Sequence, residues 1–461
     1  MSVESLAFGG QGVARYHDFV VFIDQGIPQQ KVLARIFKIK KNHAEARLLR
    51  VLEQSPHFLE APCPHFGACG GCRLQHLSYP QQLEAKQRQV VDTLSRLSGF
   101  SDFTLLPILP SPDLFYYRNK MEFSFSRHRF ITSDEIASGQ QVQKEGLFLG
   151  LHARGFFDKV VDIRNCMLFH PLANDILQEI RAIAENSRLP AYSTHDHTGF
   201  WRFVVFRHAK ITDELMTNIV AIHYDKDIAD ELRERIMAKF PAITSLIYST
   251  TTSKASVAFG EKEYLLSGKP TITEKIGPYS FEISANSFFQ TNSKGTKRLY
   301  DSVIEMAGFR GDENVFDLYC GAGTISLYVS GLVRQVTGFE VIPSAVDDAL
   351  RNALNNGISN CHFVRCDLMN GLQDSESIVA RFGKPDLLII DPPRGGMHPK
   401  TVKAILALAP QKIVHVSCNP TTLARDLAVL CENDYVLTKV QPVDMFPHTA
   451  HIEVVVQMVR K

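Results

Sequence analysis

The chain has 461 residues, and its 50 Lys and Arg against 49 Asp and Glu leave a formal charge of +1 with His neutral. At about 100–200 residues per domain this length implies two to four domains. Hydrophobic residues at 45% and charged residues at 21% exclude wholesale disorder. No apolar run approaches the ~20 residues of a membrane span, and the start MSVESLAFGGQG lacks the features of a secretory signal. We therefore expect a cytoplasmic protein whose nine cysteines are ligands, nucleophiles or core residues rather than disulfides.

Residues 1–55 have the pattern of short strands joined by turns. The segment KVLARIFKIKKNHAEARLL alternates apolar and basic residues, which is typical of a strand with one buried face. Several such strands in so few residues predict a small β-barrel. Its basic side chains form either a solvated strand face or an RNA contact surface, and they are Lys31, Arg35, Lys38, Lys40, Lys41, Arg47 and Arg50.

A cluster of cysteines follows in CPHFGACGGC. Cys63, Cys69 and Cys72 lie within ten residues of one another, among glycines that allow the chain to wrap tightly. Three ligands of a metal site require a fourth, and Cys166 in DIRNCMLF is the best candidate. Ligation by four cysteines suits either a 4Fe–4S cluster or zinc, and the spacing does not decide between them.

The rest of the predicted central domain, residues 56–280, is mostly strand. A helix is expected at 79–97, because its apolar positions recur at helical spacing and Gly99 follows as a stop. From 116 to 281 strand patterns recur, which predicts a mostly antiparallel β domain. The polar segment 131–146 is expected to be an exposed loop or insertion.

Residues 281–461 form the third predicted domain. From about Gly295 strands alternate with helices, which indicates βαβ units and a parallel sheet with helices on both faces. The last two strands, 435–443 and 451–459, have no helix between them and are expected to pair as an antiparallel hairpin at the sheet edge.

The first strand of this domain ends in DLYCGAG, where two glycines let the backbone approach a ligand. Acidic residues close the following strands, and we single out Glu340, Asp367 and Asp391. A pocket with this many acids suits a cation better than a pyrophosphate. S-adenosylmethionine is a sulfonium cation without phosphate, and it is the cofactor that this pattern favours.

The fourth and fifth strands end in DPPRGG and SCNP. Methyltransferases that modify exocyclic amines carry an aromatic residue after the two prolines, which stacks on the flipped base. Arg394 stands there instead, which disfavours amine methylation. Cys418 lies on the same carboxyl edge as Asp391, and an antiparallel last strand brings Glu453 to that edge.

These groups predict a reaction at carbon 5 of uracil, which is not nucleophilic by itself. Addition of the Cys418 thiolate to carbon 6 activates carbon 5 for methylation. Glu453 then removes the carbon-5 proton so that the thiolate is eliminated, and burial raises its pKa towards that of a useful base. The target uracil must leave the stack of RNA bases to reach the thiol. This step is easier in looped or single-stranded RNA.

Together these motifs resemble the bacterial 23S ribosomal RNA (uracil-5)-methyltransferases, a family with an N-terminal TRAM domain and a 4Fe–4S cluster. The resemblance covers nearly the whole chain and includes LAFGGQGVAR, YYRNKMEFSF, SFFQTN and DMFPHTAHIE. It implies a C-terminal Rossmann-like class I methyltransferase domain, an N-terminal OB-like barrel and a central β domain carrying the cluster. It also implies an RNA-binding enzyme that is monomeric.

Carried over residue by residue, the family's nucleophile falls on Cys418 and its base on Glu453. Its cofactor contacts fall on Gln290, Tyr319, Glu340 and Asp391, and its cluster ligands on Cys63, Cys69, Cys72 and Cys166. Gln290 rests on the match to SFFQTN alone. The transfer-RNA branch usually lacks the TRAM domain and the cluster, so the resemblance favours ribosomal RNA.

Three other hypotheses compete with this one. They are a transfer-RNA uridine-5-methyltransferase, a non-catalytic RNA-binding protein with an iron–sulfur cluster, and an amine methyltransferase of adenine or guanine. Cys418, Glu453 and Asp391 together argue against the non-catalytic protein, and Arg394 argues against the amine methyltransferase.

Overall fold

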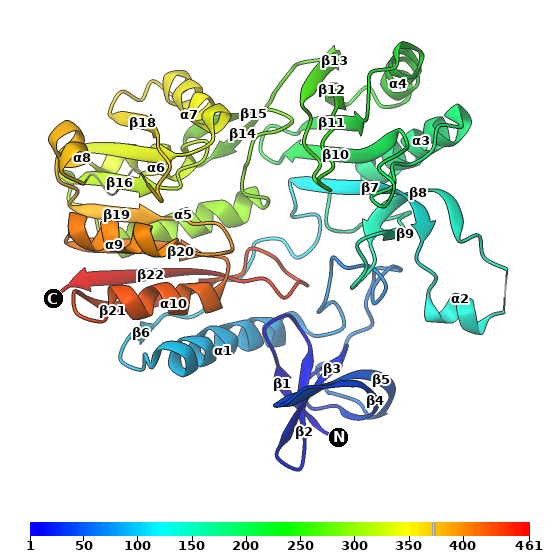
Figure 1. Ribbon diagram of the computed structural model, residues 1–461, viewed down its shortest axis with the longest axis horizontal. Helices are drawn as coiled ribbons and strands as arrows, with labels where there is room; N and C mark the ends of the chain where they lie inside the picture. Colours follow the sequence, from blue (N-terminus) through cyan, green and yellow to red (C-terminus); the bar gives the residue numbers. More distant parts are fainter. Residues whose placement is uncertain (140, 371, 373–374) are drawn as a thin grey trace.

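The computed structural model describes residues 1–139, 141–370, 372 and 375–461, and its elements form three regions (Figure 1). Gln140, in the segment predicted as a loop, lies outside the described residues. None of the helices in the described part of the chain has the length and apolar character of a membrane span.

The N-terminal region is a five-stranded sheet in the order β1-β2-β3-β5-β4. Its strands are β1 (Val3–Leu6), β2 (Gly12–Tyr16), β3 (Phe19–Asp24), β4 (Lys31–Ile39) and β5 (His43–Glu53). A bridge between Ser2 and Lys31 joins the two outer strands, so the sheet closes on itself as the predicted barrel.

The central region is a seven-stranded sheet in the order β13-β12-β11-β10-β7-β8-β9. Its strands are β7 (Lys120–Arg129), β8 (Glu145–His152), β9 (Lys159–Asp162), β10 (Trp201–Ala209), β11 (Glu214–Ala221), β12 (Ile243–Thr250) and β13 (Lys262–Gly268). The ladder from β13 to β9 is antiparallel except where β11 pairs with β12, so the predicted mostly antiparallel sheet is confirmed.

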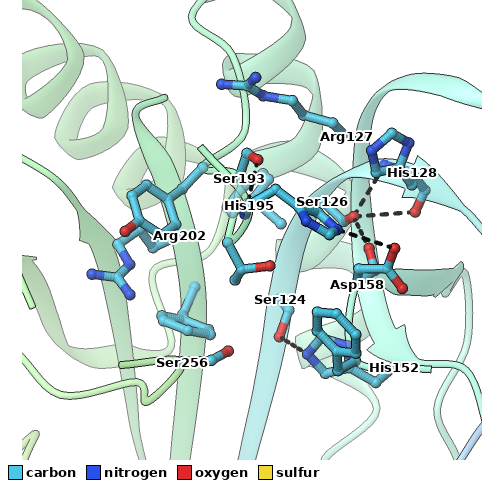
Figure 2. Close-up of a pocket in the computed structure, with 15 residues that line it drawn as sticks. Ser124, Ser126, Arg127, His128, His152, Asp158, Ser193, His195, Arg202 and Ser256 are labelled. Atoms are coloured by element: carbon cyan, nitrogen blue, oxygen red, sulfur yellow. Dashed lines mark hydrogen bonds and ion pairs between the residues drawn. The ribbon is translucent and has the colours of Figure 1, made fainter. Parts of the chain in front are cut away.

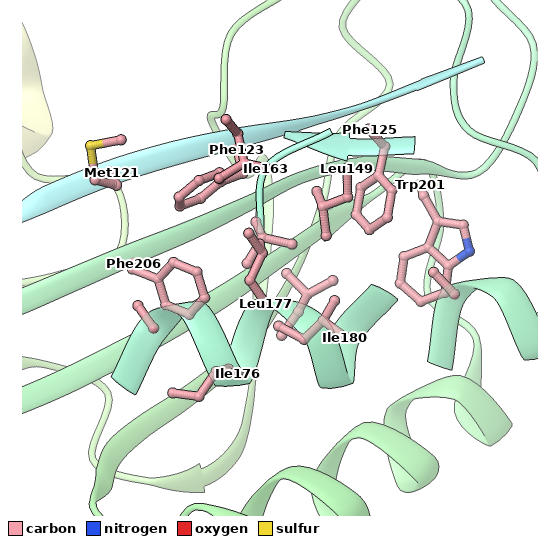
Figure 3. Packing of buried hydrophobic residues seen from close by; sticks show 14 of the residues in the cluster. Met121, Phe123, Phe125, Leu149, Ile163, Ile176, Leu177, Ile180, Trp201 and Phe206 are labelled. Carbon is pink, nitrogen blue, oxygen red and sulfur yellow. The ribbon is translucent and has the colours of Figure 1, made fainter. Parts of the chain in front are cut away.

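Two helices of this region were not anticipated, α3 (Leu172–Ser187) and α4 (Lys226–Lys239). The apolar face of α3, with Ile176, Leu177 and Ile180, packs against Phe125 and Phe206 of the sheet (Figure 3). The central strands β10, β11 and β12 are buried on both faces, which explains why their sequences are nearly continuous apolar runs.

The segment predicted as a loop contains one helical turn, α2 (Ser133–Ala137). Thr132 and Glu135 form a reciprocal capping box, in which the Thr132 hydroxyl accepts from the Glu135 amide at 3.2 Å. This local pairing makes a short helix where the polar composition predicts only a loop.

The C-terminal region is an eight-stranded sheet in the order β18-β17-β16-β19-β20-β22-β21-β6. Its strands are β16 (Asn314–Leu318), β17 (Gln335–Glu340), β18 (Cys361–Arg365), β19 (Leu387–Ile390), β20 (Lys412–Ser417), β21 (Tyr435–Val443), β22 (Glu453–Arg460) and β6 (Thr104–Leu105). A separate hairpin of β14 (Ile272–Ile276) and β15 (Tyr279–Ile283) precedes this sheet.

The last two strands pair antiparallel as predicted, but they do not form the edge by themselves. β22 lies between β20 and β21, and β6 from much earlier in the chain pairs with β21 as the outermost strand. The prediction of the edge was wrong because the pairing of a two-residue strand carries no sequence pattern.

Helices cover both faces of this sheet, as the alternating pattern predicts (Figure 1). They are α1 (Tyr79–Ser98), α5 (Ser293–Ala307), α6 (Thr324–Val329), α7 (Pro343–Asn355), α8 (Ser375–Phe382), α9 (Pro399–Leu408) and α10 (Pro420–Leu430), with a 3₁₀ turn η1 (Ser330–Leu332). The predicted helix at 79–97 is α1, and Gly99 with φ of 71° ends it. It packs beside α10 and thus ties the N-terminal half of the chain to the C-terminal sheet.

Candidate active site and thiol cluster

The turn after β16 forms one wall of a site at the carboxyl edge of the C-terminal sheet. Tyr319, Gly321 and Gly323 have φ of 65°, 54° and 75°, so this turn runs through the left-handed region. That conformation suits glycine and strains tyrosine, and strain of this kind is found at ligand sites.

Glu340, the last residue of β17, stabilises this turn by hydrogen bonds. Its carboxylate accepts from the Gly321 amide at 3.0 Å and from the Val341 and Ile342 amides at 2.7 and 2.9 Å. The acid that the sequence singles out therefore lies beside the glycine turn, as expected. Asp367 is exposed after β18, where it accepts from the Met369 amide at 3.0 Å.

Asp317 and Asp391 place two more carboxyl groups at this edge. Burial raises the pKa of each to about 7, and the charge of Asp391 contributes to the shift at Asp317. One oxygen of Asp317 accepts from Ser326, while Oδ1 is buried with no hydrogen-bond partner. A cationic ligand relieves such a concentration of acids, so the residues fit a sulfonium group.

Gln290 lies in the loop before α5, and its amide donates to Asp391 at 3.4 Å. The structure thus brings together Gln290 and Asp391, which are distant in the sequence. Tyr319 and Glu340 lie at the ends of the neighbouring strands of the same edge.

Cys418 and Glu453 meet across two antiparallel strands. β20 pairs with β22 in a register that sets Ser417 against Val454, so the next residue along β20 faces Glu453. Side chains opposite one another in such a pair have Cβ atoms about 4.5–5.5 Å apart. The Glu453 charge contributes to the pKa of Cys418, so the two side chains lie close enough to interact.

The charges around Cys418 hold it in the thiol form. Burial raises the pKa of Cys418 to about 11, the Glu453 and Asp391 charges add to the shift, and Arg394 opposes it. Burial also raises the pKa of Glu453 well above its usual value, with Asp391 adding and Arg394 opposing. Arg394 is therefore the cation that favours the charged form of both groups.

Arg394 is held in place by the segment before β22. Its guanidinium donates to His451 Nδ1 at 2.8 Å, and the Asn419 amide donates to the Arg394 carbonyl at 3.1 Å. Burial lowers the pKa of His451 to about 4, so this imidazole is neutral and accepts from Arg394. The sequence analysis assigned no role to His451, because nothing in its local pattern shows which residue it contacts.

A cavity of about 150 Å³ opens beside the Cys418 thiol. It is lined by residues from four separate parts of the chain, Phe8, Gly9, Arg394, Cys418, Asn419, Ala450 and His451. Phe8 and Gly9 belong to the N-terminal barrel, and the sequence analysis did not connect them with the site.

A second cavity, of about 540 Å³, lies beside strands β7 and β8 of the central sheet and contains the four cysteines predicted to bind a metal. Cys63, Cys69, Cys72 and Cys166 all line it, so the structure brings the fourth cysteine to the other three. In the described residues no three of these sulfur atoms lie within 4.8 Å of one another. A tetrahedral zinc ion with Zn–S bonds of about 2.3 Å requires closer packing than this.

Hydrogen-bond donors are directed at these sulfur atoms. The Gly71 amide donates to Cys69 Sγ at 3.4 Å, and main-chain donors at His65 and Leu168 lower the pKa of Cys63 and Cys166. Burial dominates and raises the pKa of all four cysteines. Buried thiols surrounded by N–H donors are suited to bind metal as thiolates.

A third hollow lies on the face of the central sheet (Figure 2). Cationic and imidazole side chains line it, namely Arg127, His128, His152, His195 and Arg202. The Arg202 guanidinium lies 4.3 Å from the centre of the Tyr192 ring, and the Ser124 hydroxyl is 3.2 Å from His152 Nε2. These are groups that contact phosphates and bases in RNA-binding proteins.

Comparison with known proteins shows the family to which the chain belongs. Residues 206–461 match the family described as tRNA (Uracil-5-)-methyltransferase, and residues 2–49 match the TRAM domain. An uncharacterised RNA methyltransferase of Chlorobaculum tepidum is 43% identical over 93% of this chain and 89% of that protein. Another, from Porphyromonas gingivalis, is 40% identical over 100% of this chain and 99% of that protein.

A solved structure also matches over nearly its full length. It is the Pyrococcus abyssi tRNA (uracil-54, C5)-methyltransferase in complex with S-adenosyl-L-homocysteine, with a TM-score of 0.75 and 28% identity over 99% of this chain and 98% of that one. The expected class I methyltransferase fold and TRAM domain are confirmed. The chain therefore belongs to the uracil-5-methyltransferase family and is an RNA-modifying enzyme that uses S-adenosylmethionine.

Proposed function

We propose that this enzyme forms 5-methyluridine with Cys418 as nucleophile and Glu453 as general base. The observation that carries the proposal is the β20–β22 register, which sets Ser417 against Val454 and so brings the adjoining Cys418 and Glu453 to one sheet edge, near Asp391. The acids at the same edge support the cofactor assignment to Gln290, Tyr319, Glu340 and Asp391.

Each residue has one defined task in the reaction. The Cys418 sulfur bonds to carbon 6 of uracil, and the electrons of the carbon 5–carbon 6 double bond make carbon 5 nucleophilic. Bound S-adenosylmethionine supplies an electrophilic methyl group. Glu453 takes the proton from carbon 5, the double bond re-forms, and the bond between sulfur and carbon 6 breaks.

Before the reaction begins, Cys418 must lose its proton and Glu453 must be able to accept one. Burial raises the pKa of Cys418 to about 11, so the free enzyme holds it as a thiol at neutral pH, and burial also raises the pKa of Glu453. Arg394 stabilises the thiolate when the proton leaves. A bound cation at the acidic edge lowers the pKa of Glu453 in the same way, which restores it as a base.

The test uses RNA containing 5-fluorouridine, in which fluorine replaces the proton that the base must remove. Wild-type enzyme should form a covalent adduct that survives denaturation, and Cys418→Ala should form none and transfer no methyl groups. Glu453→Gln should add to ordinary RNA and remain attached to it. Methyl transfer by Cys418→Ala would contradict the assignment of Cys418 as the nucleophile. Normal release of methylated RNA by Glu453→Gln would contradict the assignment of Glu453 as the general base.

We propose also that Cys63, Cys69, Cys72 and Cys166 hold a 4Fe–4S cluster. The four thiols line one cavity of about 540 Å³, and hydrogen-bond donors directed at them suit metal-bound thiolates. The choice of a cluster over a single zinc ion rests on the family resemblance. Iron and acid-labile sulfide should each be present at about four per chain in anaerobically purified protein. Stoichiometric zinc without iron would contradict the cluster, and Cys166→Ser should lower the iron content.

We propose 23S ribosomal RNA as the substrate of a monomeric enzyme, with RNA bound by the barrel (1–55) and the central region (56–280) beside the catalytic region (281–461). The hollow with Arg127 and Arg202 supports a contribution of the central sheet. Transfer RNA is the second candidate, because the similar Pyrococcus abyssi enzyme is named for it. Mapping 5-methyluridine in both RNAs from cells lacking this protein distinguishes them.

A further inference from the structure

The cavity beside Cys418 receives part of its wall from the other end of the chain. We propose that Phe8 of the N-terminal barrel is the stacking surface for the target uracil, and that the barrel is thereby part of the active site. This inference rests on the proposed role of Cys418. It goes beyond that role because it assigns base recognition to a residue outside the catalytic region.

The turn between β1 and β2 presents Phe8 on a tight loop. The Ala7 amide donates to the Gln11 carbonyl at 2.8 Å, and the Gly10 amide donates to the Ala7 carbonyl at 2.9 Å. Gly9 and Gly10 have φ of 104° and 80°, which lets the chain reverse in this space. The turn therefore has a defined shape of its own.

This turn is also fixed against the body of the enzyme. The Gln89 amide of α1 donates to the Leu6 and Ala7 carbonyls at 3.2 and 3.1 Å, and Gln89 itself is buried. A Cβ on Gly10 would lie 3.2 Å from Arg73 Cβ and 3.3 Å from Ala450 Cβ. The loop thus docks against the segment before β22, which places Phe8 at the cavity.

The Phe8 ring is available for a ligand, because the residue is 43% exposed. The 150 Å³ cavity is below the ~300–1,000 Å³ of pockets for drug-sized molecules, so it suits one base rather than a whole nucleotide. Aromatic rings bind extruded bases by stacking. Polar groups of Arg394, Asn419 and His451 line the same cavity and are suited to the base edges.

The sequence motif at the fourth strand supports the same assignment. Amine methyltransferases stack the flipped base on an aromatic residue after the two prolines, and Arg394 occupies that position here. Phe8 supplies an aromatic ring to the cavity that Arg394 lines. The stacking surface thus comes from the barrel, while the proline loop supplies a cation to the thiolate.

The experiment compares Phe8→Ala with Phe8→Tyr, which keeps the ring, and with Phe37→Ala as a matched control. Phe37 is an exposed aromatic residue of the same barrel that does not line the cavity. The rate of adduct formation with 5-fluorouridine RNA is measured in a single turnover at saturating enzyme. S-adenosylmethionine affinity and the thermal midpoint are measured as controls for folding.

Phe8→Ala should slow adduct formation about 10- to 100-fold, the range expected for loss of one stacked base. Phe8→Tyr and Phe37→Ala should stay within about twofold of wild type, and cofactor affinity should not change in any variant. An unchanged rate in Phe8→Ala, or an equal loss in Phe37→Ala, overturns the stacking role. Failure of the wild-type enzyme to form any adduct instead overturns the nucleophile, so the two failures are distinguishable.

Discussion

At the scale of single residues, the reactive edge is an arrangement of acids around one thiol and one guanidinium. Asp391 and Glu453 both raise the pKa of Cys418, and Arg394 lowers it. Burial is the largest cause of the raised pKa, which is about 11, so Cys418 is a thiol at neutral pH. A thiol in this state is protected from adventitious alkylation and oxidation, because the thiolate is the reactive form.

Arg394 should control how much of Cys418 is thiolate. In Arg394→Gln, alkylation of Cys418 by iodoacetamide at one mildly alkaline pH should slow by up to about fivefold, since an exposed charge pair contributes up to about 1 kcal/mol. Arg394→Lys keeps the charge and should react at nearly the wild-type rate. Peptide mapping by mass spectrometry follows Cys418 separately from the other cysteines. Equal rates in all three proteins would contradict the role of Arg394.

Asp317 should make the free enzyme less stable as the pH rises. Its pKa is raised from 3.8 to about 7 in the fold, so between these values the folded state holds a proton that the unfolded state has lost. Stability therefore falls with increasing pH across this window, by at most about 1.4 kcal/mol per pH unit for this group. Thermal melts from pH 4 to 7 should show a weaker decline in Asp317→Asn. A decline as steep as that of the wild type would exclude Asp317 as its source.

At the scale of elements, α1 connects the parts of the chain that build the site. Its Gln82 amide donates to the carbonyls of Leu74 and Leu77, and Gln82 Oε1 accepts from the His448 amide. The Arg73 and Leu74 amides in turn donate to the His448 carbonyl at 2.7 and 2.9 Å. The cysteine loop, α1 and the segment before β22 therefore form one hydrogen-bonded junction.

A buried ion pair holds this junction together. Lys86 of α1 donates to Asp444 at 2.7 Å, and both residues are almost completely buried. Lys86→Met leaves Asp444 without its cation and should destabilise the protein by about 3–5 kcal/mol in chemical denaturation. Lys86→Met combined with Asp444→Asn should recover part of this loss, because no charge is then left buried.

The matched control is Lys297→Met, which removes an exposed pair with Asp301 at one-helix-turn spacing. It should change stability by no more than about 0.5 kcal/mol. An equal effect of Lys86→Met and Lys297→Met would show that the buried pair has no special importance for docking α1.

The elements themselves were predictable where their pattern is local. The 79–97 helix and the strands ending at Glu340, Ile390 and Ser417 follow from periodicity and from stop signals such as Gly99. α3 and α4 were not predicted, because the strongly apolar strands on either side of them gave the whole segment the pattern of a β domain. The edge strand β6 has two residues, too few for any periodicity to identify.

At the scale of the whole molecule, the charges nearly cancel, so RNA attraction must come from local surfaces. On the barrel, Lys31 is paired with Glu53 at 2.9 Å, and Lys40 is paired with Glu45 at 2.9 Å. Arg35 and Arg47 face one another across β4 and β5. Like charges in this position repel, and a bound phosphate relieves the repulsion.

Arg35→Gln with Arg47→Gln should therefore make RNA binding less dependent on salt. The slope of log K against log salt should become shallower by about 1.4, if each arginine neutralises one phosphate of single-stranded RNA at about 0.7 per contact. Lys31→Gln is the control, because Glu53 already neutralises that lysine. Titrations over a range of salt concentrations measure all three slopes, and a double variant with the wild-type slope would remove this face from the RNA path.

The sequence by itself determined the family and the methyltransferase sheet, and it predicted a reactive thiol, its acids and a cysteine cluster. Strand ends and glycine turns are local features, and the carboxyl ends of parallel strands share an edge, so Asp391 and Cys418 could be assigned to one site. Only the tertiary structure decided which surfaces complete that site. The register that sets Glu453 against Cys418 depends on β22 entering between β20 and β21. The contact of Phe8 with the cavity depends on how the barrel docks, and such long-range packing leaves no periodic trace in the sequence.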